Sequence, residues 1–562
     1  MEQVKTPWES SMGNIPMHLS YFNGNLYDAL AVSANKFPGA IAFDFMGKST
    51  RYKTFLKDIH LCANALVNLG IRAGDRVTIA MPNCPQALTF FYGLNLMGAV
   101  ANMIHPLSAE GEIEFYLKES QSVALLTLDD FYEKVKPICE KANIKHLIVT
   151  SIADALPFPK KIAYRLTKAK KYNTNWEAIT WSTFMGLGMK INLAFPHGEG
   201  DRTAVILYSG GTTGITKGIL LTNGNFNALG QQVAAANPMY RPGDKMLAAM
   251  PIFHGFGLGV CIHAMLMNGG RCILVPRFTP KSYGRDLIKY KCNFIAGVPT
   301  LFEALLGQDV LNKKDLSFLK GVFSGGDTLS VELKKKLDAF LLAHNSPVTV
   351  REGYGTTETV TACCLTPPDK QKEGSIGIPF PDTYIKIVKP GTQEELPYGQ
   401  EGEILLSGPT VMQGYMNHSE ETAETLQTHA DGLTWVYTGD LGVMDHDGYL
   451  YFSGRAKRMI VSSGYNIYPA QLENIIDAHP YVQMSCVIGV PDPYKMQKVK
   501  AFIKLKPGIP PDEQIRANIL SYCAKHIAKY AMPSSIVFRE DLPKTLVGKV
   551  AYRLLEEDEA NQ

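Results

Sequence analysis

Between residues 54 and 300 the chain alternates helical and strand-like patterns, and this alternation narrows the choice of fold more than any other feature. Residues 55–69 and 85–97 are helix-like, whereas residues 76–81 and 99–104 are short apolar runs typical of strands. A strand, a helix and a second strand in this order need a right-handed crossover, which builds a mainly parallel sheet. The sequence therefore predicts an α/β fold with large parallel-sheet lobes.

The pattern changes near residue 376. Short alternating strands separated by Gly and Pro follow as far as residue 453, which is typical of a small antiparallel, barrel-like β subdomain. A compact, basic α+β segment comes next, and it includes a helix at residues 468–476 with a proline near its start. We therefore expect an N-terminal domain of residues 1–454 and a C-terminal domain of residues 455–562. The strands predicted for the β subdomain are residues 384–388, 402–406 and 448–452.

Composition and charge exclude several classes of protein. Hydrophobic residues make up 46% and charged residues 19% of the 562, as in a soluble globular protein, and a net charge of +3 gives no general attraction to nucleic acid. No run approaches about 18 apolar residues and no signal-peptide pattern opens the chain, so neither a transmembrane helix nor secretion is expected. The ten cysteines form no C-x-x-C pair, which indicates buried free thiols in a reducing cytoplasm.

The strongest functional signal is the run Tyr-Ser-Gly-Gly-Thr-Thr-Gly-Ile-Thr-Lys-Gly at residues 208–218, which follows a predicted strand at residues 203–208. Glycines let a backbone approach a ligand closely, and successive N–H groups with nearby hydroxyls can cradle phosphate oxygens. Gly218 follows the lysine, so the run is not the G-x-x-x-x-G-K-[ST] nucleotide loop, and it lacks the acidic ribose partner of a dinucleotide fold. The residues expected to hold phosphate are Ser209, Gly210, Gly211, Thr212, Thr213, Gly214, Thr216 and Lys217.

This run resembles the phosphate loop of the adenylate-forming superfamily, which contains acyl-CoA synthetases, peptide-synthetase adenylation domains and firefly luciferase. Residues 25–30 and 42–48 are most similar to those of bacterial long-chain fatty-acid–CoA ligases. The similarity spans about residues 20–555 and implies that ATP, Mg²⁺, a small-molecule carboxylic acid and coenzyme A are the ligands. The other matching segments are residues 250–257, 323–329, 352–358, 435–442, 454–469 and 542–550.

The resemblance assigns ligands to several segments of the N-terminal domain. His254 is expected beside the acyl pocket, where an imidazole can position the carboxylate without changing its own protonation. Glu358 is expected to bind Mg²⁺ together with Thr213, since Mg²⁺ takes a carboxylate plus phosphate oxygens and keeps several waters. Thr357 is expected to hydrogen-bond the α-phosphate. The nucleotide is further assigned to Gly325, Gly326, Tyr354, Gly355 and Thr356, with Tyr354 stacked on the adenine.

The C-terminal segments are assigned in the same way. Asp440 matches an acidic residue that accepts hydrogen bonds from both ribose hydroxyls, and Arg455 matches a ribose-contacting arginine. Lys549 matches the catalytic lysine, because a cation between the attacking carboxylate and the α-phosphate reduces the repulsion of two anions. Lys457 falls at the hinge about which the mobile C-terminal domain rotates, and Gly464 falls in the loop that lines the pantetheine tunnel after rotation.

Two positions depart from the superfamily pattern. Asp327 stands where an alanine or a proline is usual, so the resemblance assigns it no role. Met496 and Gln497 replace a glycine followed by an acidic residue. They lie away from the catalytic segments, so only a turn is expected to change.

The segment at residues 156–171 is not accounted for by these motifs. Its basic residues alternate with apolar ones, as in a basic amphipathic helix. Two interpretations stay open: a solvated surface helix, which the pattern favours slightly, and a helix on an anionic membrane surface that gives a cytoplasmic enzyme peripheral contact with the inner face of the membrane. A homodimer is also compatible with the sequence.

Three alternatives stay open for the substrates. The acid is a medium- or long-chain fatty acid, or it is an aromatic acid of the coumarate or benzoate type. In the third alternative the acyl group passes to an acyl carrier protein. A phosphoryl-transferring ATPase would release ADP and needs a lysine–threonine pair that residues 208–218 lack, and a non-catalytic acyl-binding relative would have lost Lys549 or Glu358. We therefore predict an AMP-forming acid–thiol ligase that releases AMP and pyrophosphate.

Overall fold

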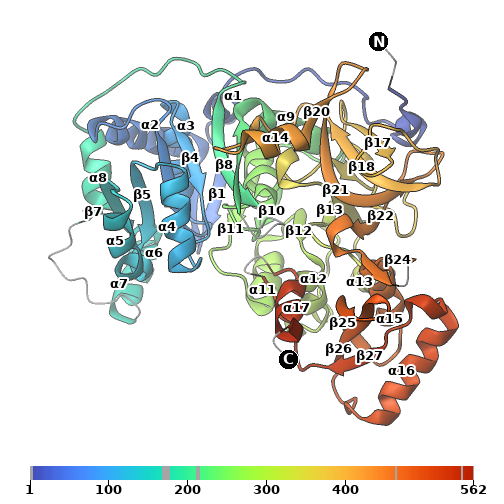
Figure 1. Cartoon of the computed structure of the whole chain (residues 1–562). Coiled ribbons are helices and arrows are strands. Elements are labelled where there is room, and N and C mark those ends of the chain that lie inside the picture. Colours follow the sequence, from blue (N-terminus) through green and yellow to red (C-terminus); the bar gives the residue numbers. More distant parts are fainter. Residues whose placement is uncertain (1–3, 168–177, 210–215, 463–464, 546–547, 561–562) are drawn as a thin grey trace.

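The computed structural model describes residues 4–167, 178–209, 216–462, 465–545 and 548–560. Within these ranges the chain forms four sheets, of nine, eight, five and five strands. Figure 1 shows the two larger sheets with their helices in the body of the molecule, one small sheet beside them, and the other in a lobe at the C-terminal end. The predicted α/β class, with an antiparallel β subdomain and an α+β C-terminal part, is confirmed.

The eight-stranded sheet flanks the predicted phosphate loop. Its parallel centre is buried on both faces, which explains why its strands are continuous apolar runs. β9 (Lys217–Thr222) returns antiparallel to β8 (Thr203–Ser209), and residues 210–215 connect the two. Next to β8 the sheet continues through β4 (Val100–Met103), β3 (Arg76–Ala80) and β5 (Ala124–Leu128), which are connected by helices such as α3 (Pro85–Leu96).

The nine-stranded sheet brings three more of the predicted segments to one edge. β10 (Lys245–Ala248), β12 (Phe294–Gly297), β13 (Gly321–Ser324) and β14 (Val350–Tyr354) run parallel, each paired with the next. Their carboxyl ends meet at the same edge, so the loops that carry His254, Gly326 and Glu358 converge there. Ligands of open α/β sheets bind at this edge.

The β subdomain is an antiparallel sheet ordered β17 (Tyr384–Val388), β18 (Glu401–Ser407), β21 (Thr434–Met444) and β20 (Leu426–Thr428), and β22 (Leu450–Arg455) pairs with β21. The prediction for the last strand began two residues too early. Gly448 has a φ of +80°, which ends the preceding turn, so β22 starts at Leu450.

The C-terminal part has its own sheet and its own buried clusters. β25 (Val482–Asp492) and β26 (Met496–Leu505) make a long hairpin, which β23 (Ile460–Ser462), β24 (Tyr465–Ile467) and β27 (Ser535–Phe538) complete. α15 (Pro469–Asp477) begins one residue after the predicted start, at the proline that was expected near it. The predicted boundary between residues 454 and 455 falls at the end of β22, and the division into two moving domains stays a prediction.

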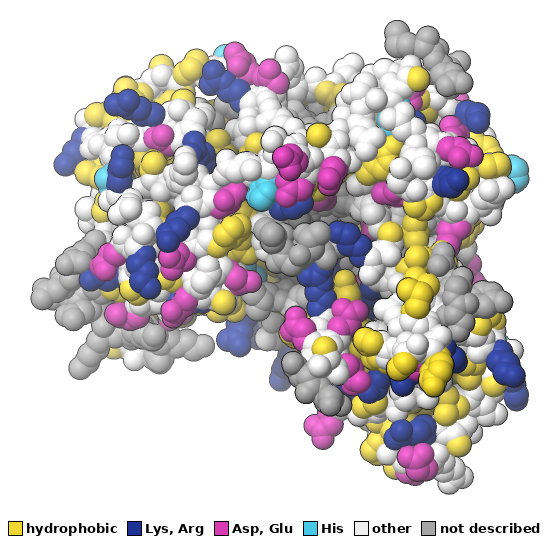
Figure 2. Space-filling view, in the orientation of Figure 1, with side chains coloured by type: hydrophobic (Ala, Val, Ile, Leu, Met, Phe, Trp, Pro, Cys, Tyr) yellow, Lys and Arg dark blue, Asp and Glu magenta, His cyan; other side chains and the backbone are white. Residues whose placement is uncertain are grey.

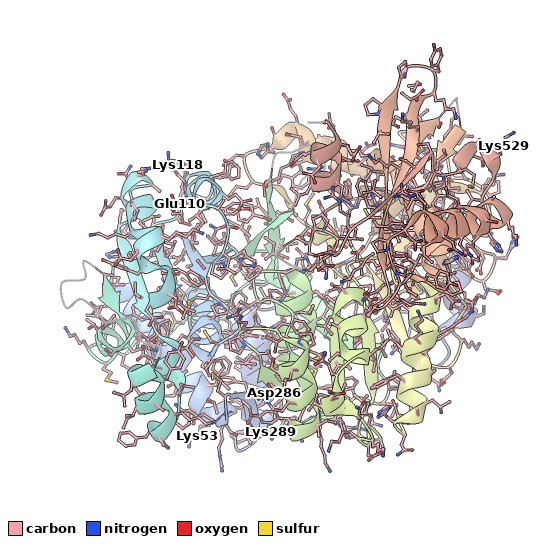
Figure 3. All side chains as sticks on the ribbon, turned by 90° about the horizontal axis from the view of Figure 1, so that it is seen from below. Lys53, Glu110, Lys118, Asp286, Lys289 and Lys529 are labelled. Atoms are coloured by element: carbon pink, nitrogen blue, oxygen red, sulfur yellow. The ribbon has the colours of Figure 1, made fainter. Side chains whose placement is uncertain are left out.

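The C-terminal lobe approaches the body from one side. Figure 3 shows Lys529 of this lobe on the same side as Glu110 and Lys118 of α4 (Glu110–Glu119). Lys53 of α2 (Tyr52–Asn68) and Asp286 of α11 (Pro280–Tyr290) lie on the opposite side.

The basic segment at residues 156–171 is helical as predicted, through α7 (Phe158–Thr167), and residues 168–171 lie outside the described ranges. Several apolar side chains of α7 are exposed. Among the helices in the described ranges, none combines the length and the apolar composition needed to cross a membrane.

Candidate active site

The loop that carries Lys549 docks on the carboxyl edge of the nine-stranded sheet. Thr300 Oγ1 donates a hydrogen bond of 2.9 Å to the carbonyl oxygen of Gly548. Gly326 has a φ of +81°, and a Cβ atom on it would lie 3.6 Å from Lys549 Cε and 3.9 Å from Lys549 Nζ. Two predicted segments that are far apart in the sequence are therefore in contact.

The ammonium group of Lys549 lies among groups of both signs. Burial has the largest effect on the pKa of Lys549, and the net effect is to lower this pKa. The negative charges of Asp327 and Asp440 raise it, and the positive charge of Arg455 lowers it further. Asp327, to which the resemblance gave no role, is thus one of two carboxylates that oppose the Lys549 charge. Figure 2 shows the hollow between body and lobe, in which Lys and Arg side chains gather. The hollow is suited to bind anions.

Asp440 is a buried carboxylate that faces Arg455 across the β21–β22 pair. Its Oδ1 atom lies 3.1 Å from Arg455 Nε, and its Oδ2 atom accepts a hydrogen bond of 2.7 Å from Tyr354 Oη. Oδ1 accepts no hydrogen bond from the residues that the structure describes, although it is buried. A buried carboxylate oxygen that is ion-paired but accepts no hydrogen bond fits the predicted ribose hydroxyls of ATP.

The loop after β14 is strained where it approaches His254. Val360 and Thr361 have φ values of +53° and +75°, which β-branched residues rarely adopt, and such strain is typical of functional sites. The Oγ1 atom of Thr361 packs on Gly255, since a Cβ atom there would lie 2.1 Å from it. Burial, with the nearby charge of Lys549, lowers the pKa of His254 to about 3. The imidazole is therefore neutral, which agrees with a residue that positions the carboxylate or shapes the pocket without changing its own protonation.

Lys217 and Glu358 are both in contact with Tyr415, a residue outside the predicted motifs. Tyr415 Oη donates a hydrogen bond of 2.9 Å to Glu358 Oε1. Lys217 Nζ lies 5.0 Å from the centre of the Tyr415 ring and 3.6 Å from Glu421 Oε1. Sequence reasoning missed Tyr415 and Glu421, because their contacts depend on pairing of β9 with the two-residue strand β19 (Gly414–Tyr415), which no local pattern indicates.

The described part of the chain contains no group of three or more His, Cys, Asp or Glu side chains that could hold a metal ion. Mg²⁺ needs no such group, because in nucleotide sites it is bound through one or two carboxylates plus phosphate oxygens. Glu358 fits this set of donors. Its predicted partner Thr213 lies outside the described residues.

The remaining predicted residues differ in what the structure says of them. Gly355 must be a glycine, since a Cβ atom would lie 2.5 Å from a carbonyl oxygen of the same loop. The buried Thr356 hydroxyl has no hydrogen-bond partner among the described residues, and Thr357 opens the short helix η5 (Thr357–Thr359). Lys457 is exposed in η6 (Ala456–Arg458). Of the others, Thr216 is half-buried, only the backbone of Ser209 is described, and Gly210, Gly211, Thr212, Gly214 and Gly464 lie outside the described residues.

Comparison with known proteins shows the family. Residues 30–416 match the model of the AMP-binding enzyme, and residues 471–549 match the AMP-binding enzyme C-terminal domain. A long-chain-fatty-acid–CoA ligase of Bacillus subtilis (strain 168) is 35% identical, with 100% of this chain and 99% of the relative covered; one of Yersinia pestis is 33% identical, with 87% and 86% covered. The crystal structure of ATP-bound MatB from Rhodopseudomonas palustris has a TM-score of 0.82 at 26% identity, with 96% of this chain and 99% of that chain covered. The chain therefore belongs to the AMP-binding enzyme family.

Proposed function

We propose that this protein is an AMP-forming fatty-acid–CoA ligase, which activates a medium- or long-chain fatty acid with ATP and transfers the acyl group to coenzyme A. The proposal is carried by the contact of Lys549 with Gly326, which holds a cation near Asp440 on the nucleotide side and His254 on the acyl side. Formation of an acyl-adenylate requires such a cation, because both reacting groups are anionic. The names of the relatives, long-chain-fatty-acid–CoA ligases, support the choice of acid and thiol.

In the first half-reaction, a carboxylate oxygen of the fatty acid attacks the α-phosphorus of ATP. The bond from that phosphorus to the bridging oxygen breaks, and pyrophosphate leaves. Lys549 reduces the repulsion between the two anions and stabilises the negative charge of the transition state. Asp440 accepts hydrogen bonds from the ribose, and Thr357 donates one to the α-phosphate. Glu358 and Thr213 would hold Mg²⁺, which supplies positive charge to the polyphosphate.

In the second half-reaction, the coenzyme A thiolate attacks the acyl carbonyl carbon, the bond from that carbon to the phosphate oxygen breaks, and AMP leaves. Adenylation needs Lys549 in a closed site, whereas attack by the thiol needs open access to the mixed anhydride, so one arrangement cannot easily serve both steps. We infer that the C-terminal domain rotates about Lys457, withdraws Lys549 and presents the loop of Gly464. Lys457 is exposed in the short η6 turn, where a change of backbone dihedrals disturbs little packing.

The test of this function is acid-dependent AMP release with ATP, Mg²⁺ and coenzyme A. Fatty acids of graded length are compared with several aromatic acids, and AMP, ADP and the acyl thioester are separated by chromatography. We expect AMP release to peak among medium or long fatty acids, with one acyl-CoA formed per AMP. If only aromatic acids were turned over, the substrate would be an aryl acid. If AMP release required acyl carrier protein, the acceptor of the acyl group would be that protein and not coenzyme A. ADP in place of AMP would contradict the reaction class.

We also propose that α7 contacts the membrane surface from which the fatty acid comes. Phe158, Ile162 and Leu166 are spaced four residues apart, so they share one stripe of the helix. Their exposed fractions are 78%, 47% and 82%, which is unusual for three large apolar side chains on one stripe of a helix. Lys160 and Lys161 stand between Phe158 and Ile162 in the sequence. Lys161 lies 3.9 Å from a carboxylate oxygen of Asp154, whereas Lys160 donates a hydrogen bond of 2.7 Å to the uncharged carbonyl of Met46 and keeps a positive charge that anionic lipid attracts.

The double variant F158E/L166E is expected to lose sedimentation with vesicles of phosphatidylglycerol and phosphatidylcholine. Each apolar side chain that enters the interface contributes roughly 1.5 kcal/mol or more, so either change alone weakens binding about tenfold. The control is Leu342→Glu, a residue 76% exposed on α13 (Val331–Ala343), which should sediment as the wild type does. If the wild type does not sediment, or the double variant sediments equally, α7 is a solvated surface helix.

A further inference from the structure

Tyr415 contacts two charged side chains of opposite sign, those of Glu358 and Lys217. Its hydroxyl donates a hydrogen bond of 2.9 Å to Glu358 Oε1, and its ring centre lies 5.0 Å from Lys217 Nζ. The Lys217 side chain is only 16% exposed, so its ammonium group is partly removed from water. One side chain therefore touches the anion proposed to hold Mg²⁺ and a cation proposed to hold phosphate.

The backbone around Tyr415 is fixed against the strand that carries Lys217. β19 pairs antiparallel with β9, with Tyr415 opposite Ile219, so Lys217 is its diagonal neighbour. The residues on both sides are bonded to β9 as well, since Gln413 N donates to Leu220 O at 2.9 Å and Met416 N donates to Gly218 O at 2.7 Å. The contact of the ring with Lys217 therefore follows from the register of two paired strands.

A second anchor comes from α14 (Ser419–Thr425), which follows β19. The backbone N–H of Tyr415 donates a hydrogen bond of 2.9 Å to Thr422 Oγ1 of this helix. Glu421 of the same helix places Oε1 3.6 Å from Lys217 Nζ. The Lys217 ammonium group is thus held between a carboxylate and an aromatic face, both supplied by one short segment.

Glu358 is tied to the same segment twice. Its carbonyl oxygen accepts a hydrogen bond of 2.8 Å from Met412 N, and its side chain accepts the bond from Tyr415 Oη. The Tyr415 hydroxyl is the donor of this second bond, because a carboxylate oxygen only accepts. A carboxylate accepts on both oxygens, so a bond to Oε1 leaves Oε2 for a cation.

We propose that Tyr415 is a positioning residue for the metal and the polyphosphate. Its hydroxyl orients the Glu358 carboxylate toward Mg²⁺, and its ring restricts the Lys217 ammonium group to a position beside the phosphates. The inference rests on the proposed function, because it takes ATP and Mg²⁺ as the ligands. The two contacts come from different parts of one side chain, so substitution can remove the hydroxyl contact alone or both contacts together.

The test measures metal and nucleotide binding without turnover. Mn²⁺ replaces Mg²⁺ so that the free ion can be counted by electron paramagnetic resonance, and α,β-methylene-ATP serves as the unreactive nucleotide. Y415F keeps the ring and loses the hydroxyl, so its affinity for Mn²⁺ in the presence of nucleotide should fall about tenfold. Its affinity for the nucleotide in EDTA should not change. Y415L loses both contacts, so its nucleotide affinity in EDTA should also fall, by about fivefold.

Tyr451→Phe is the matched control. It removes a tyrosine hydroxyl that donates a hydrogen bond of 3.3 Å to Asp445 Oδ2 in the β subdomain, so both affinities should stay at the wild-type value. Thermal melting by circular dichroism shows that each variant is folded at the assay temperature. The proposal is overturned if folded Y415F binds Mn²⁺ as the wild type does, or if folded Y415L binds the nucleotide in EDTA as the wild type does. A wild-type enzyme that binds Mn²⁺ and nucleotide but releases no AMP with any acid would contradict the proposed function alone.

Discussion

Lys549→Ala is expected to lower the rate of acyl-adenylate formation about 10²- to 10³-fold, the loss that follows removal of one preorganised group that stabilises transition-state charge. The Lys549 side chain is only half-buried at the edge of the site, so its removal opens no cavity in the core and the fold should persist. Without it, Asp327 and Asp440 leave negative charge beside two anionic substrates. Exchange of labelled pyrophosphate into ATP, measured without coenzyme A, reports this step alone.

The same variant should transfer the acyl group from presynthesised acyl-adenylate to coenzyme A at close to the wild-type rate. The proposed rotation removes Lys549 from the site before the thiol attacks, so its loss does not matter there. Lys544→Ala is the matched control, because Lys544 lies on the same loop but pairs with Asp541 at 3.8 Å. If Lys549→Ala exchanged pyrophosphate at close to the wild-type rate, the proposed role of the Lys549 ammonium group in adenylation would be wrong.

Much of the fold was predictable because it depends on local patterns. The strands β3, β4 and β17 and the helices α2 and α3 follow apolar periodicity and Gly or Pro boundaries, and the structure places them within a few residues of the prediction. The pairing of β19 with β9 was not predictable. A two-residue strand has no pattern of its own, and its partner lies about two hundred residues earlier in the chain.

In the candidate site, too, features with a local sequence signal were predictable and features that depend on long-range contacts were not. The resemblance to the superfamily indicated Asp440, Lys549 and Glu358, because each stands in a segment that matches one of its motifs. The residues that hold them could not be found in this way, since Tyr415 and Glu421 act through strand pairing and α14 rather than through a motif. The positive φ values at Val360 and Thr361 also had no signal in the sequence, because β-branched residues disfavour that conformation and packing on Gly255 overrides the preference.

Lys457→Pro is the second variant with a large expected effect, and it should impair the thioester-forming step about 100-fold. Proline fixes φ near −65° and restricts the preceding residue, and an incompatible backbone conformation is disfavoured by about 3 kcal/mol. A hinge residue needs different backbone dihedrals in the two domain arrangements. A fixed φ therefore makes at least one of the two arrangements unfavourable. The η6 turn joins β22 to β23, so a restriction at Lys457 acts on the whole C-terminal lobe.

Lys457→Ala separates the backbone from the charge, because alanine removes the ammonium group and leaves φ free. It should carry out both half-reactions at close to the wild-type rate. Each half-reaction is measured alone, pyrophosphate exchange for adenylation and single-turnover acyl transfer from presynthesised acyl-adenylate for thioester formation. If Lys457→Pro performs both at the wild-type rate, the hinge does not lie at this residue. If Lys457→Ala loses as much as Lys457→Pro, the ammonium group is what matters there, and the rotation must be sought at another point of the junction.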